Sequence, residues 1–139
     1  MIRYFQEDIR FEFKQKMLNN RWLKMVAGSE MRRLGAINII FCSDNYILDV
    51  NMKYLQHDYF TDIITFDYCE GKKLSGDLFI SIDSVRENAL EYGVEFDEEL
   101  HRVMVHGLLH LIGYDDHTPE EEKLIHEKED YYLKLRAVV

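Results

Sequence analysis

The sequence predicts an α/β fold, an α+β sandwich in which a small mixed four-stranded sheet packs against about five helices. Short runs of β-branched residues alternate with segments whose apolar residues recur at helical spacing. The resulting order, β-α-β-α-β-β-α-α-α, is typical of a sheet covered by helices. The chain of 139 residues contains no repeat and no Pro/Gly/Ser-rich linker, so we expect a single domain over residues 1–139.

Four strands are expected at residues 2–5, 37–42, 63–68 and 77–81. Each is rich in β-branched and aromatic residues, which favour a pleated and partly buried surface. The turn-like segment 70–73 separates the last two runs, so these two are expected to pair as a β-hairpin.

Helices are expected over about residues 11–34, 44–54, 84–92, 97–112 and from 119 onward. Gly35 is the expected C-cap of the first helix, and Ser43 or Asp44 is the expected N-cap of the second. The last helix has the clearest start, because Thr118 is a good N-cap and Glu121 completes a capping box.

The net charge of −9 weakens the case for a nucleic-acid partner without excluding a local basic groove. Proteins that bind nucleic acids gain affinity by neutralising phosphates with Lys and Arg. Much of the acid lies in two runs near the C-terminus, at residues 120–122 and 127–130. Such runs usually form a solvated helix face, and we expect that here.

The sequence also predicts a cytoplasmic protein. Its start has no apolar signal-peptide core, and no apolar stretch approaches the roughly 20 residues needed to span a bilayer. The two cysteines, Cys42 and Cys69, lack the CxxC spacing of a metal or redox site. They are expected to be reduced, buried thiols.

The most informative stretch is 100–117, with the sequence LHRVMVHGLLHLIGYDDH. Its apolar residues lie nearly all round a helix, which predicts a buried central helix. His106 and His110 are four residues apart and therefore project from one face. Gly107 inside a helix costs about 1 kcal/mol relative to Ala, which indicates that something approaches the backbone closely there.

Two histidines at this spacing can hold a zinc ion together with a third ligand from beyond the helix end. Gly113 ends the helix, and the acidic and imidazole side chains of residues 115–117 follow at once. Three protein ligands leave one position open for water, as in catalytic zinc sites, and zinc lowers the pKa of such water to about 7. One zinc ion is therefore the expected cofactor, with nickel or another divalent metal as the open alternative. Gly107 stands where HExxH proteases carry their general base, which argues against a peptidase of that type.

The sequence HGLLHLIGYD at 106–115 resembles the HGxLHLxGYDH signature of the YbeY family, bacterial endoribonucleases and ribosomal RNA maturation factors. Segments 61–66 (TDIITF) and 75–80 (SGDLFI) resemble that family's T-D/N-V-L-S-F and GD-I/L-x-I segments. The resemblance covers roughly residue 37 to the final helix. It implies an α/β fold, one zinc on three ligands, cleavage of single-stranded RNA and work on the 3′ end of small-subunit ribosomal RNA.

The chain departs from the family pattern at two places. The family's third ligand is a His six residues after the second, which here is Asp116, while His117 comes one residue later. Register favours Asp116 and ligand type favours His117, so one of these two is expected as the third ligand. Leu55 stands where the family usually has an Arg, counted from Asn51. A guanidinium can clamp a phosphate and Leu cannot, which puts the strength of catalysis in question.

Further candidates lie in the segment before the third predicted strand. His57, Thr61 and Asp62 are expected substrate-binding residues, and His57 is also a weaker candidate for catalysis. Tyr59 and Phe60 are aromatic residues of the kind that stack on bases in single-strand binders. No general base is assigned, and water held by the metal is the expected nucleophile.

The leading hypothesis is a zinc-dependent endoribonuclease that processes ribosomal RNA, with single-stranded RNA and ribosomal RNA as partners and ribosomal proteins as further ones. The alternative is a ribosome-assembly binding factor whose metal is mainly structural and which has little or no nuclease activity. Leu55 and the net charge of −9 favour that alternative. A metal-dependent hydrolase of a small molecule is the third hypothesis, because it needs no basic groove.

Overall fold

The computed structural model describes residues 1–57 and 60–139. Its elements follow the predicted order, so the predicted fold class is confirmed. They are β1 (Ile2–Gln6), α1 (Lys16–Ser29), β2 (Arg33–Cys42), α2 (Asp44–Leu55), β3 (Ile63–Asp67), β4 (Lys73–Ser81), α3 (Ile82–Tyr92), α4 (Phe96–Ile112) and α5 (Pro119–Arg136).

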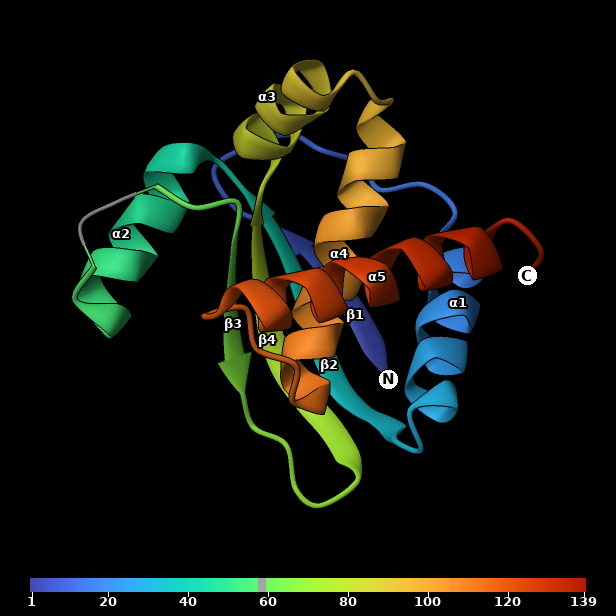
Figure 1. Cartoon of the computed structure of the whole chain (residues 1–139). Coiled ribbons are helices and arrows are strands. Elements are labelled where there is room, and N and C mark those ends of the chain that lie inside the picture. The colour runs from blue at the N-terminus through green and yellow to red at the C-terminus, as the bar shows by residue number, and fades with distance from the viewer. Residues whose placement is uncertain (58–59) are drawn as a thin grey trace.

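The four strands form one mixed sheet in the order β1-β2-β4-β3 (Figure 1). β1 and β4 both run parallel to β2, whereas β3 pairs with β4 in the antiparallel direction. The predicted hairpin is therefore confirmed, and β3 is an edge strand. This places the start of β3, near residue 62, at the margin of the sheet beside α4 (Figure 1).

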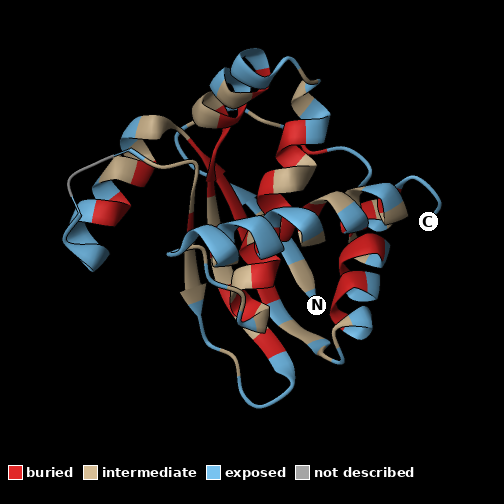
Figure 2. Ribbon diagram, in the orientation of Figure 1, coloured by how far each residue is buried: buried red, intermediate tan, exposed pale blue. Residues whose placement is uncertain are grey.

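The two faces of the sheet are covered unequally, because side chains alternate between them along each strand. On β4, Leu78 and Ile80 join the main core with α1, α4 and α5, while Phe79 joins a smaller cluster with α2. Burial is accordingly concentrated between the sheet and the helices in front of it in Figure 2. α4 is the most buried of these helices, as predicted.

Gly107 lets α4 lie close to the sheet. A Cβ placed there would be 2.7 Å from Ile63 Cδ1 and 3.1 Å from Leu78 Cδ2. The expectation of a close approach at this glycine is confirmed, and the approaching groups are side chains of β3 and β4. The cost of a helical glycine is thus balanced by tight packing of the helix that carries both histidines.

The first predicted helix is too long, and its predicted cap is wrong. α1 covers only 16–29, because Gln15 before it and Met31 after it both adopt positive φ angles of 60°. Gly35 lies in β2, next to a register irregularity against β4, and a Cβ there would be 2.9 Å from the Leu74 carbonyl oxygen. Gly35 therefore allows β2 and β4 to approach each other closely, and it does not end a helix. Residues 33 and 34, predicted as the end of the helix, belong to β2.

The helix starts are mostly as expected. Ser43 caps α2 by accepting a hydrogen bond from the Tyr46 amide, and the Thr118/Glu121 capping box of α5 is present. α3 begins at Ile82, two residues before the predicted start at 84, because Ser81 is its N-cap. Cys42 is buried and Cys69 half-buried, and both are free thiols. Among the helices described, none is long and apolar enough to cross a bilayer.

His101 of α4 is half-buried between α1 and α5. Arg136 of α5 donates from Nε to His101 Nδ1 at 3.0 Å, and the ring meets Trp22 edge to face with centroids 6.0 Å apart. Burial, aided by the positive charge of Arg136, lowers the pKa of His101 from 6.5 to about 4. His101 is therefore neutral in the folded protein at pH 5, whereas in the unfolded chain it is protonated.

We expect His101 to make the folded state less stable in mild acid. Its folded pKa lies below its unfolded value, so its contribution is complete above pH 6.5 and is lost as pH falls toward 4. Between pH 6.5 and 4.5 the free energy of unfolding should fall by about 2 kcal/mol more in the wild type than in His101→Gln. Urea denaturation of both proteins at the two pH values measures this difference, and identical pH dependence would contradict it.

Gly107→Ala should couple energetically to Ile63. The added methyl meets Ile63 Cδ1, the atom that Ile63→Val removes, so the second change should cost about 0.5–1.5 kcal/mol in the wild type and clearly less in the Gly107→Ala background. Ile64→Val is the matched control, because Ile64 packs on the other face of the sheet. Chemical denaturation of the two double-mutant cycles measures the coupling. Equal coupling at both isoleucines would rule out the close approach.

Candidate metal centre

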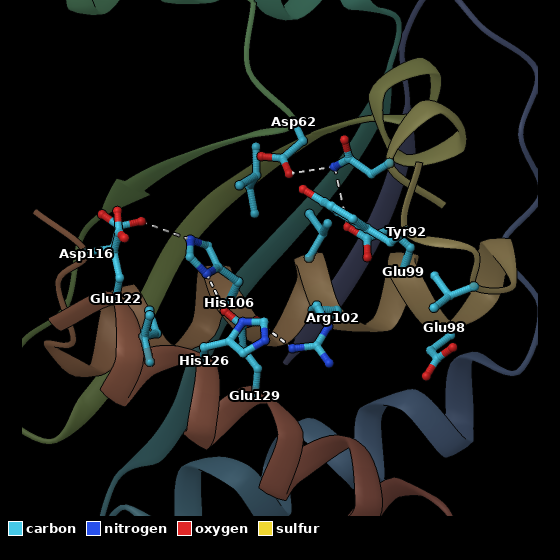
Figure 3. Close-up of a pocket in the computed structure, with 15 residues that line it drawn as sticks. Asp62, Tyr92, Glu98, Glu99, Arg102, His106, Asp116, Glu122, His126 and Glu129 are labelled. Carbon is cyan, nitrogen blue, oxygen red and sulfur yellow. Dashed lines mark hydrogen bonds and ion pairs between the residues drawn. The ribbon is translucent and has the colours of Figure 1, made fainter. Parts of the chain in front are cut away.

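α4 carries the central side chains of the site on one face. Arg102, His106 and His110 are spaced four residues apart, so they line a single stripe along the helix. Arg102 and His106 face α5, and the start of β3 lies across the same cavity (Figure 3). Gly113 ends α4 with a φ of 124°, and the chain then turns back so that Asp116 meets the two histidines.

Three potential metal ligands converge at the C-terminal end of α4. The Nε2 atoms of His106 and His110 are 2.9 Å apart. Asp116 Oδ2 is 3.5 Å from the first and 3.4 Å from the second. Each histidine side chain is 24% exposed and that of Asp116 is 37% exposed, so the cluster is accessible from one side.

These separations fit a metal ion. Ligand atoms about 2.0–2.1 Å from a tetrahedral zinc lie about 3.3 Å from one another, close to the three distances found here. Two imidazoles and one carboxylate are a donor set that zinc accepts, and three protein ligands leave room for a further one. Imidazole also suits nickel, copper and iron, so the donor set alone defines a divalent metal site rather than a zinc site.

The cluster borders a cavity of about 560 Å³ between α3, α4, α5 and the start of β3 (Figure 3). His106 and Asp116 lie at one end of it. Among the charged side chains of the lining, carboxylates outnumber basic groups, and the guanidinium of Arg102 is already paired with Glu129 and Asp130. The acidic members are Asp62, Glu98, Glu99, Asp116, Glu122 and Glu129.

Glu129 of α5 contacts His106 at Nδ1, the ring nitrogen that does not face His110 and Asp116. Its Oε2 lies 2.6 Å from His106 Nδ1, and its Oε1 accepts from Arg102 Nη1 at 2.9 Å. Figure 3 shows the His106 ring between Asp116 on one side and Glu129 on the other. Burial by itself lowers the pKa of His106, but the hydrogen bond and charge of Glu129 and the charge of Asp116 outweigh it, and the pKa is raised.

Sequence reasoning missed Glu129 and Arg102. Glu129 belongs to an acidic run expected to be solvated, yet it is only 5% exposed. The missed signal is its spacing, because Ile125, Glu129 and Tyr132 share the buried face of α5. Arg102 carried a similar signal, since it stands four residues before His106 on the same face.

Asp62 lines the cavity and is half-buried. Asn88 Nδ2 donates to Asp62 Oδ2 at 3.1 Å and to Glu99 Oε2 at 3.4 Å, so one amide holds two acidic side chains. Burial raises the pKa of Asp62 against the opposing charge of His106 and the hydrogen bond from Asn88. Glu99 has a raised pKa for the same principal reason, burial.

The other predicted site residues lie elsewhere. His117 is exposed, and its backbone amide donates to Glu121 Oε1 at 3.2 Å. His57 is exposed after the end of α2, and Thr61 donates to the Ile63 carbonyl at 3.3 Å. Within the described part of the chain, these three side chains are not among those lining the cavity.

Three more residues were singled out from the sequence: Leu55, Tyr59 and Phe60. Leu55 ends α2 with 39% exposure, and Phe60 is 58% exposed. Tyr59, proposed to stack on bases, lies outside the described residues. Lys53, the nearest cation to Leu55 along α2, forms an exposed ion pair with Asp49 at 3.2 Å.

Comparisons with known proteins identify similar proteins over nearly the whole chain. A sequence model of the family described as Endoribonuclease YbeY matches residues 1–136. A Bacteroides thetaiotaomicron protein named Endoribonuclease YbeY is 51% identical over 135 residues, covering 97% of this chain and 98% of its own. A protein of the same name from Parabacteroides distasonis is 50% identical over 134 residues, covering 96% and 94%.

A solved structure shows a similar fold. The solution structure of a Thermotoga maritima protein has a TM-score of 0.69 and 29% sequence identity, and the match covers 98% of this chain and 89% of that one. The family match spans nearly the whole sequence, including β1 and α1, which the motifs alone did not reach. The chain therefore belongs to the YbeY endoribonuclease family.

Proposed function

We propose that this protein is a zinc-dependent endoribonuclease that cleaves single-stranded RNA and matures the 3′ end of small-subunit ribosomal RNA in the cytoplasm. The convergence of His106, His110 and Asp116 is the observation that carries the proposal. Membership of the YbeY family supports the reaction type, since the similar proteins are named endoribonucleases. Residues 1–139 would then form one metal-dependent hydrolase domain.

In this proposal His106, His110 and Asp116 hold the ion, and His117 lies outside the ligand set. A bound zinc supplies a Lewis acid that polarises a phosphoryl oxygen and acidifies water. The three side chains leave one side of the cluster open, which is where a phosphodiester can approach. They also carry one formal negative charge between them when both imidazoles are neutral, less than the charge of a divalent cation.

The remaining residues would bind and orient the RNA. Asp62 is the proposed substrate contact nearest the cluster, because it lines the same cavity and is held by Asn88. His57 and Thr61 stay proposed contacts for more distant parts of the strand. The acidic cavity wall repels phosphate, so we place the backbone of the RNA on the open side of Asp116 rather than inside the cavity.

A second candidate function is a ribosome-assembly factor in which the metal is structural. Leu55 and the acidic cavity favour it, because neither offers a phosphate a cationic partner. Such a protein would bind ribosomal RNA or basic ribosomal proteins without turnover. Multiple-turnover cleavage of a short single-stranded RNA by the metal-loaded protein separates the two candidates.

Removal of the metal or of one ligand should abolish cleavage. We expect chelation, or His110→Ala, to reduce the rate of single-stranded RNA cleavage on the order of 100-fold or more, because the Lewis acid is lost. Zinc should restore the chelated wild type and not the variant. Cleavage rates, together with metal content by mass spectrometry, measure this. A His110→Ala protein that is folded, free of metal and fully active would refute the proposal.

The third ligand can be identified by a matched set of neighbours. Asp116→Ala should lose zinc affinity by at least about tenfold, because it removes one of three ligands, whereas His117→Ala and Asp115→Ala should retain wild-type affinity. Competition with a chromophoric chelator measures the dissociation constants. The reverse ranking, with His117→Ala the weaker binder, would assign the ligand to His117.

A further inference from the structure

Glu129 lies on the buried face of α5 with both of its carboxylate oxygens engaged by the metal-bearing face of α4. Oε1 accepts from Arg102 Nη1 at 2.9 Å, and Oε2 is 2.6 Å from His106 Nδ1. The side chain is only 6% exposed. A carboxylate this buried must be stabilised by its partners, and here the hydrogen-bonding partners are the guanidinium of Arg102 and the imidazole of His106. A second imidazole, that of His126, lies farther away, with Nδ1 3.7 Å from Oε1.

The arrangement defines which nitrogen of His106 carries a proton. A carboxylate has no proton to donate, so its contact with Nδ1 requires an Nδ1–H donor. In the neutral ring the lone pair is then on Nε2. Nε2 is the atom that lies 2.9 Å from His110 Nε2 and 3.5 Å from Asp116 Oδ2.

We propose that Glu129 is a positioning residue for the metal centre: it holds His106 in the Nδ1–H tautomer and in the orientation that presents Nε2 to the ion. This inference rests on the proposed metal site. Carboxylate–histidine–metal arrangements of this kind orient the ligand and raise its basicity, and their loss typically weakens metal binding by about 10- to 100-fold.

Arg102 completes the arrangement from the other side of the carboxylate. Its Nη2 donates to Asp130 Oδ1 at 2.6 Å, so two neighbouring acids of α5 fix the plane of the guanidinium. With Oε1 of Glu129 held by this guanidinium, Oε2 is directed to His106. Along this face of α4, Arg102 therefore supports Glu129, and His106 and His110 are the two metal ligands.

A purely structural role is the competing explanation. Arg102, Glu129 and Asp130 would form an ion-pair network between α4 and α5 even if His106 bound nothing. The two explanations differ in what they predict for metal affinity and for the ring nitrogens, and these are the quantities to measure.

The first measurement is zinc affinity. Glu129→Gln keeps the shape of the side chain but removes its charge, and we expect the zinc dissociation constant to rise by about 10- to 100-fold. Glu127→Gln is the matched control, because it removes the same charge from an exposed position on the same helix, and it should match the wild type. Competition with a chromophoric chelator measures all three proteins, with circular dichroism to show that each is folded.

The second measurement needs no mutation at Glu129. Long-range ¹H–¹⁵N NMR on zinc-loaded wild type, labelled at histidine, should show a slowly exchanging proton on His106 Nδ1 and zinc on Nε2. His106→Gln identifies the resonance. A proton on Nε2 would overturn the inference, even if Glu129→Gln failed to fold.

The outcomes distinguish this inference from the proposed function. Wild type that binds no zinc overturns both. Wild type that binds zinc, with Glu129→Gln folded and within about threefold of its affinity, overturns the role of Glu129 and leaves the metal centre intact. A shift confined to Glu129→Gln, with the Nδ1–H tautomer observed in the wild type, supports it.

Discussion

The site depends on how closely α4 lies against the edge of the sheet. Because residue 107 has no side chain, Ile63 and Leu78 approach the helix backbone between the two histidines. Close packing on that side leaves His106 and His110 to project from the adjoining face, where each stays partly exposed. A larger residue at 107 would have to displace either the strand or the helix. Either movement changes the position of the histidines relative to Asp116, whose loop starts at the end of the same helix.

Charge sets the second constraint. A cavity whose charged side chains are mainly carboxylates, with its guanidinium already paired, offers little attraction to a phosphodiester. In the proposed function the divalent ion supplies that attraction locally, while the acidic wall keeps the backbone out of the cavity and on the open side. The net charge of −9 and an RNA substrate are then compatible. Binding of a phosphodiester depends on the sign of the electrostatic potential at the cluster. Distant surface charges contribute little to it, because they are screened within about 10 Å at ordinary ionic strength.

The parts of the fold that local chemistry specifies could be predicted from the sequence. The capping box at Thr118, the hairpin of β3 and β4 and the buried helix of the histidines all follow from spacing and residue type. The prediction for Gly35 was wrong because its role depends on the carbonyl of Leu74. That residue is 39 positions away, and only the folded sheet brings the two together. His101 could not be predicted for the same reason, since its lowered pKa depends first on burial and then on the charge of Arg136 at the far end of the chain. Asp116 could be predicted in part. Its spacing from His110 favoured it as the third ligand, but its approach to the histidines depends on the turn after Gly113.

Glu129 illustrates how composition can hide chemistry. Within the run 127–130 it has the same residue type as the exposed Glu127, so charge alone assigns it to the surface. Its position one turn after Ile125 and one turn before Tyr132 assigns it to the core. Burying a carboxylate costs several kcal/mol unless it is paired, so an acid on an apolar stripe requires a buried donor opposite. Here the facing helix presents Arg102 and His106 four residues apart, which matches the two oxygens of one carboxylate. The acid and the two basic side chains therefore specify one another across the α4–α5 interface, and the position of the metal ligand is part of that packing.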